Sequence, residues 1–207
     1  MPKIKYFFQQ SWLLIVSSFF FGLLIAGANA AWEDKIEYNL KVYKFNKAAF
    51  AIFPEADHFD IALDNVEIKS STGKKFITSV REAVAKDGTN LGWAFICVGS
   101  GYGGEIQVIL AVDKQFEKIE GYGVLVANET PNIGEKIKFP EFKDQFVGAP
   151  ASEFNLVKAG DRDTKDSEIV AISGATISSK AVVDCFNMFI PQVKKQMLEK
   201  GLIGDEQ

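Results

Sequence analysis

The hydrophobic pattern opens with one long apolar run close to the N-terminus. No charged residue occurs from Tyr6 to Trp32. A helix needs about 20 mostly apolar residues to cross the hydrocarbon core of a bilayer, and this run is long enough. Lys3 and Lys5 precede the run, whereas Glu33 and Asp34 follow it. By the positive-inside rule, residues 1–32 form a cytoplasmic N-terminus and a single transmembrane anchor in the cytoplasmic membrane, with the soluble part on the extracytoplasmic side.

A cleaved signal peptide is the alternative for the same run. Ala28-Asn29-Ala30 resembles the small-residue site at which signal peptides are cut. The apolar segment is longer than the usual hydrophobic region of a signal peptide, so the pattern favours an uncleaved anchor. Cleavage stays open, and both alternatives place the soluble part outside the cytoplasm.

The pattern over residues 33–89 is mixed and predicts mainly helical or irregular structure. Glu33–Asn46 is expected to contain a connecting helix, and Lys47–Phe53 has helical composition up to Pro54, which a helix interior does not tolerate. A polar and poorly patterned stretch follows. Ser79–Lys86 then reads as a short helix, capped by Ser79 and stopped by Asp87-Gly88.

From residue 90 onward the pattern changes to that of a sheet followed by a helix. Trp93–Val98, Ile106–Val112 and Ile119–Val126 are apolar runs separated by turn residues, which predicts an antiparallel meander. From about Ser178, apolar residues recur at helical spacing and predict a helix that packs on the sheet, with Pro191 kinking or interrupting it and Gly201 ending it; the recurring residues are Val182, Phe186, Phe189, Val193 and Met197. Residues 90–207 are therefore expected to form an α+β domain with a mainly antiparallel sheet.

Charge and rare residues exclude several classes of function. The net charge of −4 and the pI of about 5.2 argue against nucleic-acid binding, because such proteins carry basic faces. His58 is the only histidine, so a multi-histidine metal site cannot be built. Cys97 and Cys185 lack the spacing of a zinc or iron–sulfur site. They are predicted to be buried free thiols, although a disulfide between them stays open.

The candidate chemistry lies in Ser173-Gly174-Ala175-Thr176, immediately before the last helix. Gly174 and Ala175 let a bulky group approach the backbone. Thr176 presents a hydroxyl where unpaired N–H groups and the positive end of a helix dipole suit a phosphate. The simpler alternative is that Ser173 or Thr176 is an ordinary N-cap.

These four residues resemble the flavin attachment motif of the FMN-binding domain family. In that family the last Thr of the tetrad carries FMN through a phosphoester bond, so the resemblance assigns a covalent FMN to Thr176. The family motif usually has an Asp six residues before this Thr, and here that position is Val170. Asp166 and Glu168 lie nearby but out of register.

A second motif lies upstream, at Glu129–Ile137. Pro131-Asn132 suits a type II turn, because Pro presets the first central position and Asn tolerates the positive φ of the second. Together with Gly101–Gly104, this segment resembles the Glu-Thr-Pro-Gly-Leu-Gly segment of the G subunit of Rnf electron-transport complexes. Residues that fit the same family also follow downstream, namely Phe142, Phe146 and Gly148.

The resemblance implies an electron-carrying subunit of a translocating oxidoreductase. Rnf complexes move electrons between ferredoxin and NAD and couple this transfer to sodium or proton translocation. The expected partners are the other membrane subunits and a flavin transferase that attaches FMN from FAD. The flavin pocket is expected to include Tyr102, Glu129, Thr130 and the backbone of Ser173–Ala175.

Two other functions stay open from the sequence. One is a subunit like the C subunit of the sodium-translocating NADH:quinone reductase, or a stand-alone flavinylated carrier. The other is a membrane-anchored binding domain without a cofactor, for which Val170 is the best support. It predicts a colourless protein whose behaviour does not depend on Thr176.

Overall fold

The computed structural model describes residues 2–204, apart from the side chains of residues 2–10, 34, 36–38, 40 and 41. The chain forms two compact units, one reaching to Tyr43 and the other beginning at Lys44. Helix α1 (Pro2–Ile52) contributes to both. In the first unit, Ser11–Glu33 is long and apolar enough to span a membrane, with a mean hydropathy of 2.0. A signal sequence would satisfy the same criterion, so this finding leaves the choice between anchor and signal peptide open.

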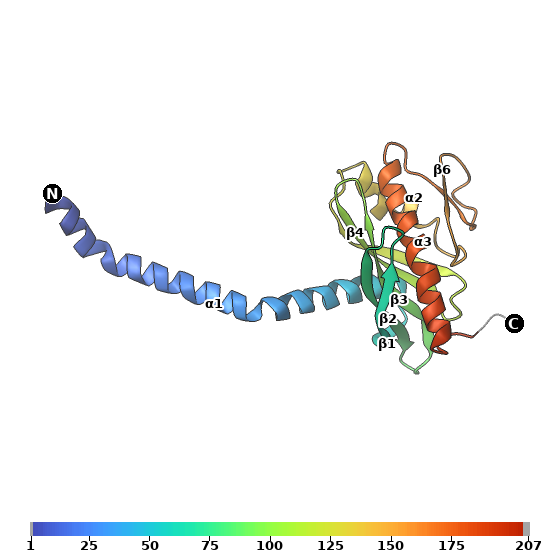
Figure 1. Cartoon of the computed structure of the whole chain (residues 1–207), viewed down its shortest axis with the longest axis horizontal. Helices are drawn as coiled ribbons and strands as arrows, with labels where there is room; N and C mark the ends of the chain where they lie inside the picture. The colour runs from blue at the N-terminus through green and yellow to red at the C-terminus, as the bar shows by residue number, and fades with distance from the viewer. Residues whose placement is uncertain (1, 205–207) are drawn as a thin grey trace. The chain divides into compact units, whose positions relative to one another are not determined.

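The second unit is built on a five-stranded antiparallel sheet whose strands follow one another in chain order (Figure 1). The strands are β1 (Ala56–Lys69), β2 (Lys75–Ala85), β3 (Asn90–Ser100), β4 (Glu105–Asp113) and β5 (Ile119–Ala127). The predicted meander of three strands is confirmed, and it is extended by two strands at its N-terminal edge. Residues 56–85 therefore share a sheet with the segment that begins at residue 90.

Both faces of the sheet are covered by helices, which explains why β4 is apolar without alternation. Val108 and Leu110 face the core that contains α3 (Thr176–Glu199). Ile109 and Ala111 face a second cluster, formed with the Lys44–Ile52 part of α1. Since successive side chains of a strand point to opposite faces, both sets must be apolar when both faces are buried.

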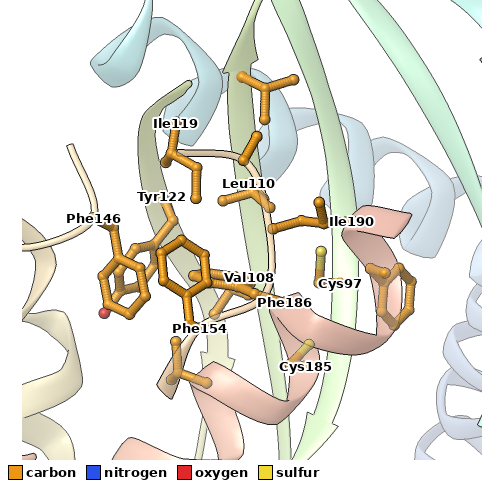
Figure 2. Packing of buried hydrophobic residues seen from close by; sticks show 14 of the residues in the cluster. Cys97, Val108, Leu110, Ile119, Tyr122, Phe146, Phe154, Cys185, Phe186 and Ile190 are labelled. Atoms are coloured by element: carbon orange, nitrogen blue, oxygen red, sulfur yellow. The ribbon is translucent and has the colours of Figure 1, made fainter. Parts of the chain in front are cut away.

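Edge-to-face aromatic packing joins the α3 face to the segments after β5 (Figure 2). Phe146 contacts Tyr122, Phe154 and Phe186 with ring centroids 5.2–5.4 Å apart. The segments held here are the 3-10 helix η1 (Gly134–Lys138), α2 (Pro140–Lys143) and the parallel pair β6 (Asn155–Val157) and β7 (Glu168–Val170). The Tyr122 hydroxyl donates a hydrogen bond to the Ile137 carbonyl at 2.5 Å.

The two cysteines meet in this core and are free thiols, as predicted (Figure 2). Cys97 lies on β3 and Cys185 on α3, and both are buried. Burial raises the pKa of the Cys97 thiol well above its usual value, and a hydrogen bond with Cys185 raises it further. The Cys97 thiol is therefore held in its unreactive protonated form.

The helix predicted over Ser79–Lys86 is wrong, because these residues belong to β2 and the hairpin after it. β2 pairs with β1 on one side and β3 on the other, so tertiary pairing overrides the helical propensity of the segment. Asp87-Gly88 makes the hairpin turn, with a hydrogen bond from the Gly88 N–H to the Ala85 carbonyl.

The stretch read as poorly patterned contains β1. Its register against β2 shifts three times, at Ala56/His58, Ile61/Leu63 and Leu63/Val66. Each shift moves the following side chains relative to the two faces. The alternation that would reveal a strand is therefore broken.

The last helix is continuous through Pro191, so the predicted interruption does not occur. Buried residues on both sides of Pro191, among them Ile190 and Val193, hold the helix on the sheet. The helix ends at Glu199, and Gly201 follows with a φ of 67°, which confirms the predicted stop. Its first residue is Thr176, two residues before the predicted start.

Candidate functional site

Thr176 is the first helical residue of α3, and its side chain is exposed. The N-cap is Ala175, which offers no side-chain hydrogen bond to the helix. Over the described part of the chain, the hydroxyls of Ser173 and Thr176 make no hydrogen bond. Neither residue caps the helix, so the simpler alternative is wrong. The helix start keeps N–H groups without intrahelical partners beside an exposed hydroxyl.

The turn before Thr176 is fixed by a buried serine. The Ala175 N–H donates to the Ile172 carbonyl at 2.9 Å, and Gly174 has a φ of 79° within this turn. Glycine adopts that conformation without steric cost. The fully buried Ser179 hydroxyl accepts a hydrogen bond from the Ile172 N–H and donates one to the Ala175 carbonyl, both at 3.0 Å. Ser179 therefore ties both ends of the turn to the first turn of α3.

Glu129 joins three segments that are far apart in the sequence. Its side chain is 8% exposed. Oε2 accepts a hydrogen bond from the Ser178 hydroxyl at 2.5 Å, and Oε1 accepts one from the Gly103 N–H at 3.1 Å. The β3–β4 turn, the segment after β5 and the first turn of α3 therefore meet at one carboxylate.

Position 134 has no room for a side chain, because Glu129 and Ser178 occupy the adjoining space. A Cβ added at Gly134 would lie 2.5 Å from Glu129 Oε2 and 2.6 Å from Ser178 Oγ. A Cβ at Gly101 would collide with Glu129 Oε1. The two glycine-containing motifs thus close around one acidic side chain, a relation that their spacing in the sequence does not show.

The segment after Glu129 makes the predicted turn. The Ile133 N–H donates to the Thr130 carbonyl at 3.1 Å, and Asn132 has a φ of 58°, as a type II turn requires. The side chain of Thr130 is exposed, and Tyr102 is 70% exposed in the β3–β4 turn. The structure thus brings the segments of both residues to the site through Glu129.

Val170, which stands where the family motif has an Asp, belongs to the core. Its side chain is buried, and its backbone pairs with Val157 across β6 and β7. The buried Gln145 amide accepts from the Val170 N–H at 2.8 Å and donates to the Val170 carbonyl at 3.2 Å. Backbone hydrogen bonds therefore position this segment.

Three site residues were missed from the sequence: Ser178, Ser179 and Gln145. Ser178 did carry a signal, since Val182 and Phe186 follow it at intervals of four on the apolar stripe of α3. A hydroxyl on a buried stripe needs a hydrogen-bond partner, and that partner is Glu129. The spacing predicts a partner but not which residue it is.

Comparison with known proteins identifies a family model and relatives that match part or most of this chain. The FMN-binding domain family model matches residues 101–190. The G subunit of the Na(+)-translocating ferredoxin:NAD(+) oxidoreductase complex of Acetobacterium woodii is 31% identical over 191 residues, which covers 90% of this chain and 91% of that protein. The G subunit of an ion-translocating oxidoreductase complex of Methanosarcina acetivorans is 40% identical over 93 residues, which is 45% of this chain and about half (46%) of that protein.

A solved structure shares the fold. The crystal structure of Shewanella oneidensis NqrC superimposes with a TM-score of 0.58 at 20% sequence identity, covering 69% of this chain and 71% of that chain. At this level of identity the similarity concerns the fold alone. It supports an α+β architecture of helices packed on an antiparallel sheet.

Proposed function

This chain belongs to the family of G subunits of ion-translocating, Rnf-type oxidoreductase complexes, and we propose that it carries electrons within such a complex on an FMN bound covalently to Thr176. A bound FMN supplies reversible one- and two-electron redox chemistry at its isoalloxazine ring. The observation that carries the assignment is the exposed, unbonded Thr176 hydroxyl at the start of α3.

The residues around Thr176 fit a phosphoester at this position. An added Cβ at Gly174 would have no atom within 4 Å, so the space beside the turn is open. The N–H groups of the first turn of α3 and the positive end of the helix dipole favour the negative phosphate. Ser179 and Glu129 hold the turn and the helix start in place without using the Thr176 hydroxyl.

Attachment requires a separate flavin transferase with FAD as donor. The Thr176 oxygen would form a bond to the phosphorus of the FMN half of FAD. The bond from that phosphorus to the bridging pyrophosphate oxygen would break and release AMP, while the hydroxyl proton passes to a base of the transferase. The exposed Thr176 hydroxyl has no hydrogen bond that must break first, so the folded chain presents it directly to such an enzyme.

The flavin ring would lie against exposed apolar side chains that neighbour, in sequence, the residues close to Glu129. Tyr102, Ile133 and Ile177 are 70%, 46% and 57% exposed. Each directly adjoins in sequence a residue that touches or closely approaches Glu129, namely Gly103, Gly134 and Ser178. Flat apolar ring faces are stabilised by such contacts. This assignment keeps Tyr102 from the expected pocket and adds Ile133 and Ile177.

The complex proposed for this subunit moves electrons between ferredoxin and NAD and couples the transfer to ion translocation. The Acetobacterium woodii relative is named for that activity. The partners would be the other membrane subunits of the complex. With the apolar segment Ser11–Glu33 as anchor, the FMN-binding domain would work on the extracytoplasmic side of the membrane.

The test is flavin loading of the full chain co-expressed with a flavin transferase. Wild type is expected to fluoresce as a flavoprotein in a denaturing gel and to gain the mass of FMN less one water. Thr176→Ala should lose both signals completely. Thr176→Ser should keep them, since it keeps the hydroxyl.

Ser173→Ala is the matched control, because Ser173 is the other exposed hydroxyl of the same turn. It should load like wild type. A dark, unmodified wild type would instead favour the anchored domain without a cofactor. A Thr176→Ala variant that still gains the mass would move the attachment to another residue.

A further inference from the structure

We propose that Glu129 is a positioning residue. It fixes the start of α3 for flavin attachment, and it places a negative charge near the flavin that lowers the flavin's reduction potential. The inference rests on the proposed function of Thr176. It assigns Glu129 a role different from the direct cofactor contact expected from the sequence.

The hydrogen bonds of Glu129 are made to other segments of the protein. Both oxygens accept hydrogen bonds from within the chain, one from the Ser178 hydroxyl and one from the Gly103 N–H. Gly134 closes a further side, since any side chain there would strike Glu129 and Ser178. Glu129 is thus enclosed, and both of its carboxylate oxygens are bonded within the protein.

The position of Ser178 explains how Glu129 acts on Thr176. Thr176 and Ser178 are the first and third residues of α3. A bond that fixes Ser178 therefore fixes the first turn of the helix and the direction in which Thr176 leaves it. Ser179 secures the preceding turn independently. Ser178 and Ser179 thus fix the helix start after Thr176 and the turn before it.

The charge of Glu129 is not balanced by a cation. In the part of the chain that the structure describes, Glu129 forms no ion pair with Lys, Arg or His. Both carboxylate oxygens accept hydrogen bonds, and one of the donors belongs to the first turn of α3. A buried charge is screened less by solvent than an exposed one, so it acts on groups close by.

A flavin attached at Thr176, two residues before the Ser178 that bonds Glu129, is such a group. The two electrons that reduce a flavin come from the redox partner, with up to two protons from water. When fewer protons than electrons are taken up, the ring gains negative charge, and a fixed negative charge nearby opposes this step. Removing the charge of Glu129 should therefore raise the midpoint potential.

Three variants of the full chain separate charge from position. Glu129→Gln keeps the shape and an oxygen for the Gly103 N–H but removes the charge. It should load flavin faster than Glu129→Ala, and its flavin should show a higher midpoint potential than that of wild type. Glu129→Ala removes both roles and should slow flavin loading at least tenfold. Ser178→Ala removes one bond but leaves the charge, so its loading should slow while its potential does not rise.

Glu135→Gln is the matched control for the loss of one negative charge. Glu135 lies in the same segment, but its side chain is 37% exposed and faces Lys138 at 3.5 Å. Its loading rate and potential should both match wild type. The potentials are measured by spectroelectrochemical titration of flavinylated chains in detergent, and the loading rates by intact mass.

Positioning is also measured without flavin, by hydrogen exchange of the unloaded full chain. Glu129→Ala should increase exchange in the peptides that contain residues 99–104 and 172–180, whereas Glu135→Gln should not. Wild-type loading of Glu129→Ala with unchanged exchange would overturn the positioning role. An unchanged potential in Glu129→Gln would overturn the electrostatic role. A wild type that takes up no flavin would refute the proposed function of Thr176, while the exchange measurement still decides the positioning role of Glu129.

Discussion

At the level of single residues, the domain depends on polar groups that are buried and bonded. Glu129 and Gln145 each join segments that the sequence separates. Ser179 ties the turn before α3 to the first turn of that helix. A buried polar group left without its partner costs about 1–3 kcal/mol, so such groups select one arrangement of loops over others. Tyr122 belongs to the same class, since its hydroxyl bonds the Ile137 carbonyl in the aromatic cluster.

Tyr122 gives a pH dependence with a definite sign. Burial raises its pKa well above the usual value of 10.0, and the nearby charge of Asp144 adds to the shift. The unfolded chain loses this proton near pH 10 while the folded chain keeps it. The contribution to stability is therefore fully present below about pH 10 and is lost as the pH rises further, by about 1.4 kcal/mol per pH unit.

The measurement is denaturant unfolding of wild type and Tyr122→Phe at neutral and alkaline pH. The variant lacks the hydrogen bond and should be about 1 kcal/mol less stable at neutral pH. It also lacks the ionisable group, so the difference between the two proteins should shrink above about pH 10. A difference that stays constant with pH would contradict the shifted pKa.

At the level of elements, each face of the sheet needs a helix of its own. α3 covers one face, and the Lys44–Ile52 part of α1 covers the other. The glycine at position 123 of β5 makes room for this second contact, because an added Cβ would lie 3.1 Å from the Cβ of Ala48. Glycine often marks a break in a strand, but Gly123 is here the position at which α1 approaches β5 closely.

Shortening the chain tests the cover on this second face. A fragment that begins at Lys44 keeps Phe45 and Phe53, which are buried against the sheet, whereas one that begins at Pro54 loses both. Burial of a Phe side chain contributes about 1.5–3 kcal/mol, so the shorter fragment should be about 3–6 kcal/mol less stable. Denaturant unfolding compares the two, with Phe45→Ala in the longer fragment as control. Equal stabilities would show that the second face needs no cover.

At the level of the whole molecule, an apolar segment and a compact domain follow one another in the chain. The unit that begins at Lys44 has its own core on both faces of its sheet. The segment Ser11–Glu33 fits a membrane span by length and composition. This order suits an electron-transfer subunit of a membrane complex.

The anchor is tested by fractionation and N-terminal mass. The full chain should remain with the membrane pellet after an alkaline carbonate wash, whereas the fragment that begins at Lys44 should stay in the supernatant. An uncleaved anchor keeps the mass of residues 1–32. A mature protein that begins at Ala31 and is released by the wash would establish the signal peptide instead.

The sequence by itself determined the features that depend on local chemistry. The apolar run, the three strands from Trp93 to Val126, the turn at Pro131-Asn132 and the exposed Thr176 at a helix start all follow from neighbouring residues. Each is a property of a short segment, such as a steric preference, a period or a fixed φ. The two motifs also indicated the family correctly.

Tertiary structure decided what depends on contacts between distant segments. β2 is a strand because β1 and β3 pair with it, although its residues alone favour a helix. Glu129 is a buried link because Ser178, 49 positions away, lies against it in the fold. Strand pairing and burial are stabilised by contacts between residues that are distant in the sequence. A local sequence pattern does not specify which distant residues make these contacts.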